Sequence, residues 1–157
     1  MPRKSTPVPH TEEFTILRRP GWSFLGAIAV TIECDPGAAH SVKLGLAVSA
    51  AYRSGASLVG ARLDGALVRG EKVSRLLASA NRLADPYTFY AFELASGGVK
   101  VLAGCRWFTI PEYRAHVAGC YADTPKGFET LDILDFFEVR CRRLDAPLEP
   151  PIAAEAA

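Results

Sequence analysis

The chain has 157 residues, of which 49% are hydrophobic and 22% are charged, and its formal net charge is +1. This composition is typical of a globular protein with one domain or two small lobes and excludes a disordered chain. The balanced charge argues against long-range attraction to nucleic acid or an anionic membrane, and the longest apolar run, Phe24–Ile32, is too short to cross a bilayer. Four widely spaced cysteines and the lack of a secretion signal lead us to expect a cytoplasmic protein with reduced thiols and no membrane segment.

The N-terminal part of the sequence predicts a tail, a strand and a helix, in that order. Residues 1–13 contain three prolines and should be flexible. Apolar and polar residues alternate over Ala27–Cys34, which predicts a strand with one buried face. A helix should follow over Val42–Arg53, with Ser41 capping its first turn and Gly55 just beyond its last residue.

Three consecutive blocks of five residues come after this helix, at 56–60, 61–65 and 66–70. Each block opens with Ala, has an aliphatic residue third and closes with Gly. The aliphatic residues are Leu58, Leu63 and Val68. Short repeats with one inward aliphatic residue per block are typical of a coiled β-solenoid, which buries its faces by stacking.

These blocks resemble the pentapeptide-repeat family, whose pattern is A-(D/N)-L-x-x. The resemblance implies a right-handed β-helix in which the leucine points inward and four blocks make one square coil. The match departs at the second position, where Ser57, Arg62 and Leu67 replace Asp or Asn. We therefore expect an α+β protein with a short right-handed pentapeptide-repeat β-helix of about one coil. A strand–helix unit should cap its N-terminal end, and a hairpin with two helices should cap its C-terminal end.

The period continues beyond the third block in weaker form and leaves two alternatives open. The next three positions in the count are also apolar: Val73, Ala78 and Leu83. The coil could therefore extend to residue 85, or residues 73–83 could instead form a helix with one apolar face. In both cases residues 14–85 should form one structural segment.

Residues 86–145 should form a small α+β lobe. Two strands are predicted, Tyr87–Leu94 and Val99–Phe108, joined by a turn that contains two glycines. The order Thr109, Ile110, Pro111, Glu112 has the pattern of a capping box and predicts a helix to about Gly119.

A longer helix should run from Thr124 to about Leu144, with acidic residues early and basic residues late, as the helix dipole favours. The residues expected on its buried stripe are Leu131, Leu134, Phe137, Cys141 and Leu144. The end of the chain, residues 146–157, is rich in Pro and Ala and should be a disordered tail.

Several segments also resemble a recurring type of small phage or prophage protein. They are Ser41–Val48, the three blocks, Ala103–Thr109 and the segment Thr124–Leu134. The resemblance implies a phage-encoded protein of the host cytoplasm, in which the repeat is a spacer between constant ends.

The sequence contains one weak candidate for a metal site or a reactive thiol. His116 and Cys120 are four residues apart on a predicted helix, and Cys105 could approach them from the strand. The three could bind zinc with a fourth ligand, or Cys105 could act as a nucleophile with His116 as its base. Strand alternation instead places Cys105 in the core between Ala103 and Trp107, where a thiol is inert. We therefore expect no cofactor, no essential metal and no catalytic thiol.

The expected function is non-enzymatic binding or inhibition of a host or phage protein, because the outward positions of a repeat can carry recognition residues on a rigid scaffold. The expected binding residues are Arg62, Asp64, Arg69, Lys72 and Arg106. Their mixed charge suits a protein partner better than nucleic acid. The open end of a short coil would also allow a homodimer.

Two alternative functions remain open. Some pentapeptide-repeat proteins mimic DNA and inhibit gyrase, but residues 56–85 carry five basic and three acidic side chains, which is the wrong sign for a mimic of DNA. A small-molecule or nucleotide binder is supported by Arg106, which stands beside Trp107 and Phe108. A guanidinium among aromatic rings can bind a phosphate or carboxylate and stack on a base.

Overall fold

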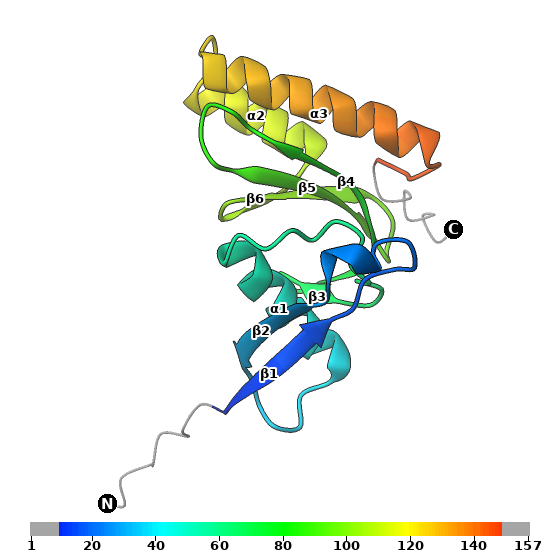
Figure 1. Cartoon of the computed structure of the whole chain (residues 1–157). Coiled ribbons are helices and arrows are strands. Elements are labelled where there is room, and N and C mark those ends of the chain that lie inside the picture. Colours follow the sequence, from blue (N-terminus) through cyan, green and yellow to red (C-terminus); the bar gives the residue numbers. More distant parts are fainter. Residues whose placement is uncertain (1–9, 149–157) are drawn as a thin grey trace, which may run out of the picture. The chain divides into compact units, whose positions relative to one another are not determined.

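The computed structural model describes residues 10–148, which form an α+β structure with three α-helices, one short 3-10 helix and two antiparallel sheets (Figure 1). The chain divides into two compact units, one ending at Gly70 and the other beginning at Glu71. Residues 71–85, which the sequence grouped with the repeat, thus belong to the same unit as the C-terminal lobe.

The first unit packs one helix against a two-stranded sheet. β1 (Thr11–Ile16) pairs antiparallel with β2 (Ile28–Glu33), and η1 (Ser23–Leu25) lies in the connection between them. α1 (His40–Arg53) contacts both strands. The helix buries the apolar residues Leu44, Ala47, Val48 and Ala51. The predicted strand and helix are therefore confirmed in type and approximate position.

Two details of this unit differ from expectation. The N-cap of α1 is Ala39, with no side-chain cap, so the predicted capping role of Ser41 is wrong because that residue lies inside the first turn. β1 begins at Thr11, within the segment expected to be a tail, and residues 1–9 of that segment lie outside the described residues.

The five-residue repeat forms successive turns, and the predicted right-handed β-helix is wrong. The carbonyl of Leu58 accepts a hydrogen bond from the Ala61 N–H, and the carbonyl of Leu63 accepts one from the Ala66 N–H, both at 3.0 Å. The glycine that closes each block has positive φ, which glycine adopts without a Cβ penalty. The period of five is thus the spacing of chain reversals.

The inward positions of the repeat are nevertheless buried as the sequence predicts. Leu58 and Leu63 are fully buried, and Val68 is 1% exposed. Only the third block contains a strand, the two-residue β3 (Leu67–Val68), which packs on α1. Three blocks are less than one coil, so no second coil is available to stack on them, and the helix α1 covers this segment instead.

The second unit contains four strands of a curled antiparallel sheet, in the order β4-β5-β6-β7, and Figure 1 labels the first three of them. Its strands are β4 (Glu71–Asn81), β5 (Thr88–Leu94), β6 (Val99–Ala103) and β7 (Arg106–Thr109). Register shifts between Val73 and Arg75 and between Leu76 and Ala78 interrupt the pairing of β4 with β5, which bends the strand. The alternatives of a coil or a helix after residue 70 are both wrong, because that segment is the strand β4.

The predicted strand Val99–Phe108 is broken into two. Gly104 has φ +58° and forms, with Cys105, a tight turn between β6 and β7. Cys105 is exposed in this turn, so the expectation that it lies in the core is wrong. The turn also moves Trp107 to the face opposite Val101, where its Nε1 donates a hydrogen bond of 2.7 Å to Glu71.

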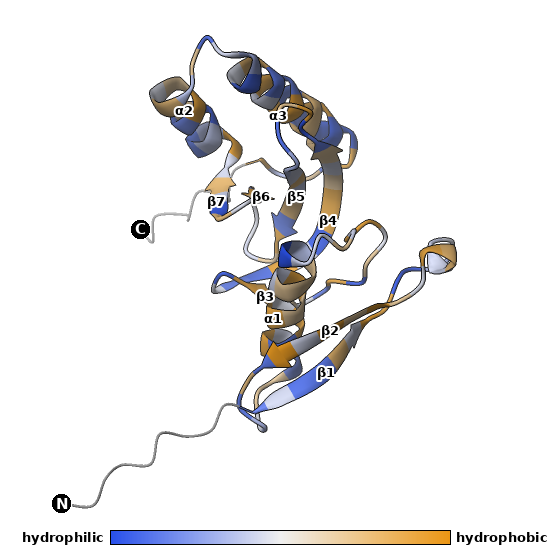
Figure 2. Cartoon of the chain, turned by 60° about the vertical axis from the view of Figure 1, so that its left-hand side comes forward, coloured by the Kyte–Doolittle hydropathy of each residue, from blue (hydrophilic) through white to orange (hydrophobic). Residues whose placement is uncertain are grey.

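Two helices cover one face of this sheet, α2 (Ile110–Cys120) and α3 (Pro125–Arg143), and Figure 2 shows hydrophobic and hydrophilic residues alternating along α3. The capping box between Thr109 and Glu112 is confirmed. Of the predicted stripe on α3, Leu134, Phe137 and Cys141 are buried, and the other two residues are partly buried. The core continues through Ala146 and Leu148, while residues 149–157 of the expected tail lie outside the described residues.

Candidate functional site

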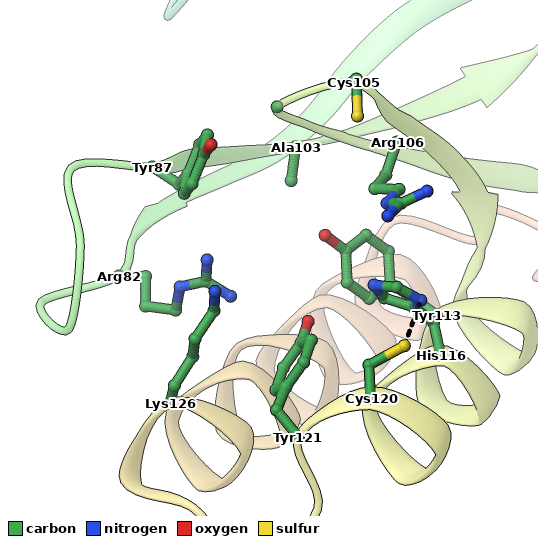
Figure 3. A pocket seen from close by; sticks show the side chains of 11 residues that line it. Arg82, Tyr87, Ala103, Cys105, Arg106, Tyr113, His116, Cys120, Tyr121 and Lys126 are labelled. Atoms are coloured by element: carbon green, nitrogen blue, oxygen red, sulfur yellow. Dashed lines mark hydrogen bonds between the residues drawn. The ribbon is translucent and has the colours of Figure 1, made fainter.

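A pocket of about 300 Å³ opens in the second unit beside the β6–β7 turn (Figure 3). Its walls come from the end of β4, the β6–β7 turn, α2 and the start of α3. Three basic residues line it, Arg82, Arg106 and Lys126, together with three tyrosines, and no acidic residue among positions 10–148 does so. The tyrosines are Tyr87, Tyr113 and Tyr121.

Arg82 is the most deeply buried of the three basic residues, with 5% of its surface exposed. Its Nε and Nη2 donate hydrogen bonds of 2.8 and 2.6 Å to the two carboxylate oxygens of Asp85, and its Nη1 donates one of 2.9 Å to Thr130. Burial lowers the pKa of Arg82, but the hydrogen bonds that Arg82 donates to Asp85, together with the negative charge of Asp85, outweigh this effect, so the pKa is raised overall. Arg82 is therefore a fixed cation in the wall of the pocket.

Aromatic rings surround the Arg82 guanidinium. Its central carbon lies 5.1 Å from the ring centroid of Phe89, 5.4 Å from that of Tyr87 and 6.0 Å from that of Tyr121. The faces of such rings attract a cation. This arrangement fixes the position of the charge.

Lys126 shares the carboxylate of Asp85 with Arg82. Its Nζ lies 3.4 Å from Oδ2 of Asp85 and 5.0 Å from the centroid of the Tyr121 ring. The hydrogen bond from Arg82 lowers the pKa of Asp85 against the opposing effect of burial, so this carboxyl is ionised at neutral pH. The single negative charge of Asp85 is thus shared by two positive charges. Lys126 also stands in the first turn of α3, where the helix dipole adds positive potential.

Arg106 supplies the third positive charge from the opposite wall. It is exposed at the start of β7, and its guanidinium carbon lies 5.9 Å from the centroid of the Phe108 ring. Within residues 10–148 it forms no ion pair. Its planar fork of donors is therefore available to a ligand.

His116 and Cys120 face the pocket from the last turns of α2 (Figure 3). The Cys120 Sγ lies 3.4 Å from Nδ1 of His116. The imidazole is held by ring contacts with Phe108, Tyr113 and Tyr121 at centroid distances of 5.6 to 5.9 Å. Burial, and then the charges of Arg106 and Lys126, lower the pKa of His116, so the ring is neutral at pH 7.

The structure brings together four of the residues singled out in the sequence: Cys105, Arg106, His116 and Cys120 line the same pocket. Among residues 10–148, however, no group of three His, Cys, Asp or Glu side chains is arranged to hold a metal ion. The expected buried position of Cys105 was the reason for considering its thiol inert, and that reason no longer holds.

The other expected binding residues lie outside this pocket. Arg62, Asp64 and Arg69 are exposed in the first unit, where Asp64 lies 3.8 Å from Arg19. Lys72 is exposed on β4. The structure therefore does not gather the expected set into one site.

Sequence reasoning missed Arg82, Lys126 and the three tyrosines. Arg82 and Asp85 flank a turn after β4, and that spacing was the one local signal that could have indicated a fixed ion pair. The contacts with Thr130 and Tyr121 join segments distant in the sequence, so no local pattern indicates them.

No helix in the described part of the chain is long and apolar enough to cross a membrane. Comparison of the chain with protein-family models, with curated proteins and with solved structures finds no match.

Proposed function

We propose that the second unit binds a small anionic ligand in the pocket beside the β6–β7 turn. The observation that carries this proposal is the charge of the wall: Arg82, Arg106 and Lys126 line the pocket, and no acidic residue in the described part of the chain does. Asp85, which stands behind the wall, neutralises only one of the three. A ligand with one or two negative charges would balance the remainder.

The shape and composition of the pocket favour a carboxylate or phosphate attached to a planar group. The Arg106 fork can bind either acid through two parallel hydrogen bonds, and Lys126 can add a third contact. The rings of Tyr87, Tyr113 and Tyr121 offer flat surfaces for the remainder of the ligand. A volume of about 300 Å³ is at the lower end of the range for small-molecule sites, so a single nucleotide or an aromatic acid is of suitable size.

The experiment follows the imidazole signals of His116 by NMR while inorganic phosphate or benzoate is added to the full chain. Binding should shift these signals in a saturable way and raise the pKa of His116, because the ligand offsets the charges of Arg106 and Lys126 that lower it. Arg106→Gln should weaken the binding by about tenfold or more, the effect of losing a charged hydrogen bond. Arg143→Gln is the matched control, an exposed arginine of the same unit at the far end of α3. Failure of both anions to shift His116 at millimolar concentration would contradict the proposal.

A second candidate function is self-association through the first unit. Phe24 and Leu17 lie in the connection between β1 and β2, and 77% and 57% of their surfaces are exposed. The Phe24 ring stacks on the Trp22 ring, with a distance of 6.1 Å between the ring centroids. The Arg62 N–H donates a hydrogen bond of 2.8 Å to the Leu17 carbonyl, which places Arg62 beside this apolar surface. Asp64 lies two residues further on, so the surface carries both charge signs and can complement a second copy of itself.

Sedimentation at several concentrations tests this second candidate. We expect a dimer that dissociates on dilution. We also expect Phe24→Ser to convert the dimer to a monomer without loss of thermal stability. A chain that stays monomeric at high micromolar concentration would exclude it. The DNA-mimic alternative depended on a β-helix, and residues 10–148 contain none.

A further inference from the structure

We propose that Cys120 is a reactive thiol that exchanges with small anionic disulfides, with His116 as the acceptor of its proton. The proposal rests on the anion-binding role of the pocket, because the same cations would hold the substrate. It assigns the pocket a class of reaction in addition to a class of ligand.

The thiol and its proton acceptor are positioned by one helix. His116 and Cys120 are separated by one turn of α2, which places both side chains on the same face. The distance of 3.4 Å between Sγ and Nδ1 is within the range of a hydrogen bond to sulfur, so no movement is needed before proton transfer. Cys120 is exposed and lines the pocket, so a ligand there can reach its sulfur.

The surroundings of His116 keep its imidazole ready to accept a proton. Burial and the two charges that face it, Arg106 from β7 and Lys126 from α3, hold the ring neutral. The other groups packed against it are the rings of Phe108, Tyr113 and Tyr121. Cys120 is the last residue of α2, one turn after His116. The thiol should therefore lose its proton to His116 as it attacks, as in general base catalysis.

The exchange step is balanced without any further reactant. The S–H proton passes to Nδ1 of His116, and the Cys120 sulfur attacks one sulfur of the disulfide. The S–S bond of the substrate breaks as the new S–S bond forms, and the second half of the substrate leaves as a thiolate. His116 returns its proton to that thiolate, or to water when the thiolate is weakly basic and leaves as an anion, which leaves a mixed disulfide on Cys120, a neutral His116 and one released thiol or thiolate.

The cations of the pocket determine which disulfides should react. Arg106 and Lys126 attract an anionic substrate, and they also stabilise the thiolate that leaves. The remaining thiols do not share this setting. Cys141 is fully buried with a pKa raised to about 11 by its burial, and Cys34 is half-buried in the first unit. Cys105 lines the pocket, but within residues 10–148 the contact of His116 Nδ1 with a thiol is made to Cys120.

The test compares two disulfides of opposite charge on the reduced full chain. Dithiobis(nitrobenzoate) is aromatic and carries two carboxylates, whereas cystamine carries two ammonium groups. We expect a fast phase with the first probe that labels Cys120, as identified by mass spectrometry of the peptides. Cys120→Ser should remove this phase, and Cys34→Ser, the control, should leave it unchanged. His116→Gln should slow it by about 100-fold, the typical contribution of a general base, while leaving the fold intact by circular dichroism.

The outcomes separate the two proposals. A fast phase that survives Cys120→Ser, or that His116→Gln leaves unchanged, would overturn the thiol proposal even if phosphate or benzoate still binds. A fast phase that depends on His116 but favours neither probe would support the thiol chemistry and contradict the anion pocket. If Arg106→Glu makes the chain react faster with cystamine than with dithiobis(nitrobenzoate), that result would support both proposals.

Discussion

Arg82 donates two hydrogen bonds to the carboxylate of Asp85 across the turn that follows β4, and Arg82 itself lines the cationic pocket. Arg82 is almost fully buried, so the pair fixes a positive charge where an unpaired guanidinium would be costly. The geometry makes Asp85 a structural residue that holds Arg82 and Lys126 in position at the pocket.

The first prediction concerns this pair. Asp85→Asn should destabilise the protein by about 3 kcal/mol, because it leaves the charge of Arg82 buried without a counter-charge. Urea denaturation followed by circular dichroism measures the change. Asp132→Asn, at an exposed position of α3, should change the stability by less than about 0.5 kcal/mol. Equal effects of the two substitutions would show that Arg82 does not depend on Asp85.

The second prediction concerns the pH dependence of stability. The pKa of His116 is lowered in the folded protein, first by burial and then by Arg106 and Lys126. The unfolded chain therefore binds more protons below the ordinary histidine pKa of about 6.5, and the free energy of unfolding falls as the pH drops through that value. Denaturation at about pH 7 and about pH 5 should show this loss, and His116→Gln should reduce it. A loss of the same size in the variant would assign the effect to other groups.

The third prediction compares two glycines of the first unit. Gly45 lies inside α1, where Ala normally stabilises a helix by about 1 kcal/mol, but a Cβ there would lie 1.8 Å from the Leu67 carbonyl oxygen. Gly65 has φ +80° in a turn with open space around it. Gly45→Ala should therefore lower the melting temperature by more than Gly65→Ala, which adds only backbone strain. A rise in melting temperature for Gly45→Ala would contradict the packing of α1 against the third block.

The fourth prediction concerns the start of α2, which carries His116 and Cys120. The Thr109 hydroxyl accepts a hydrogen bond of 3.2 Å from the Glu112 N–H, and the Glu112 carboxylate accepts one of 2.8 Å from the Thr109 N–H. Thr109→Ala should cost about 1 kcal/mol, whereas Thr109→Ser should cost much less because it retains the acceptor. Thermal denaturation of both variants measures the difference, and equal losses would show that the cap does not stabilise the helix.

Local patterns in the sequence predicted local structure well. The capping box at Thr109 and the apolar stripe centred on Leu134 depend on residues within a few turns of each other, so both could be predicted from the sequence. The burial of Leu58 and Leu63 was also predicted correctly, but the β-helix was not, because the same spacing suits both coil corners and successive turns. The two structures can be told apart only by the number of blocks, because a β-helix needs further blocks to stack on and the chain has three clear ones.

The pocket was less predictable because its residues come from segments far apart in the chain. Arg82 follows β4, which the apolar pattern described equally well as a coil or a helix, so its position could not be inferred. The turn at Gly104 was hidden inside a run that reads as one continuous strand. Missing that turn placed Cys105 in the core, whereas the structure exposes it.

The central claim is that the pocket beside the β6–β7 turn selects anions, and calorimetry with adenosine monophosphate and adenosine tests it most directly. The two ligands share the planar base and differ by the phosphate, so the difference in affinity measures recognition of charge. We predict that the monophosphate binds at least about tenfold more tightly than adenosine and that Arg106→Gln removes most of this difference. Equal affinities, no binding of either ligand, or a preference that Arg106→Gln leaves unchanged would contradict the account.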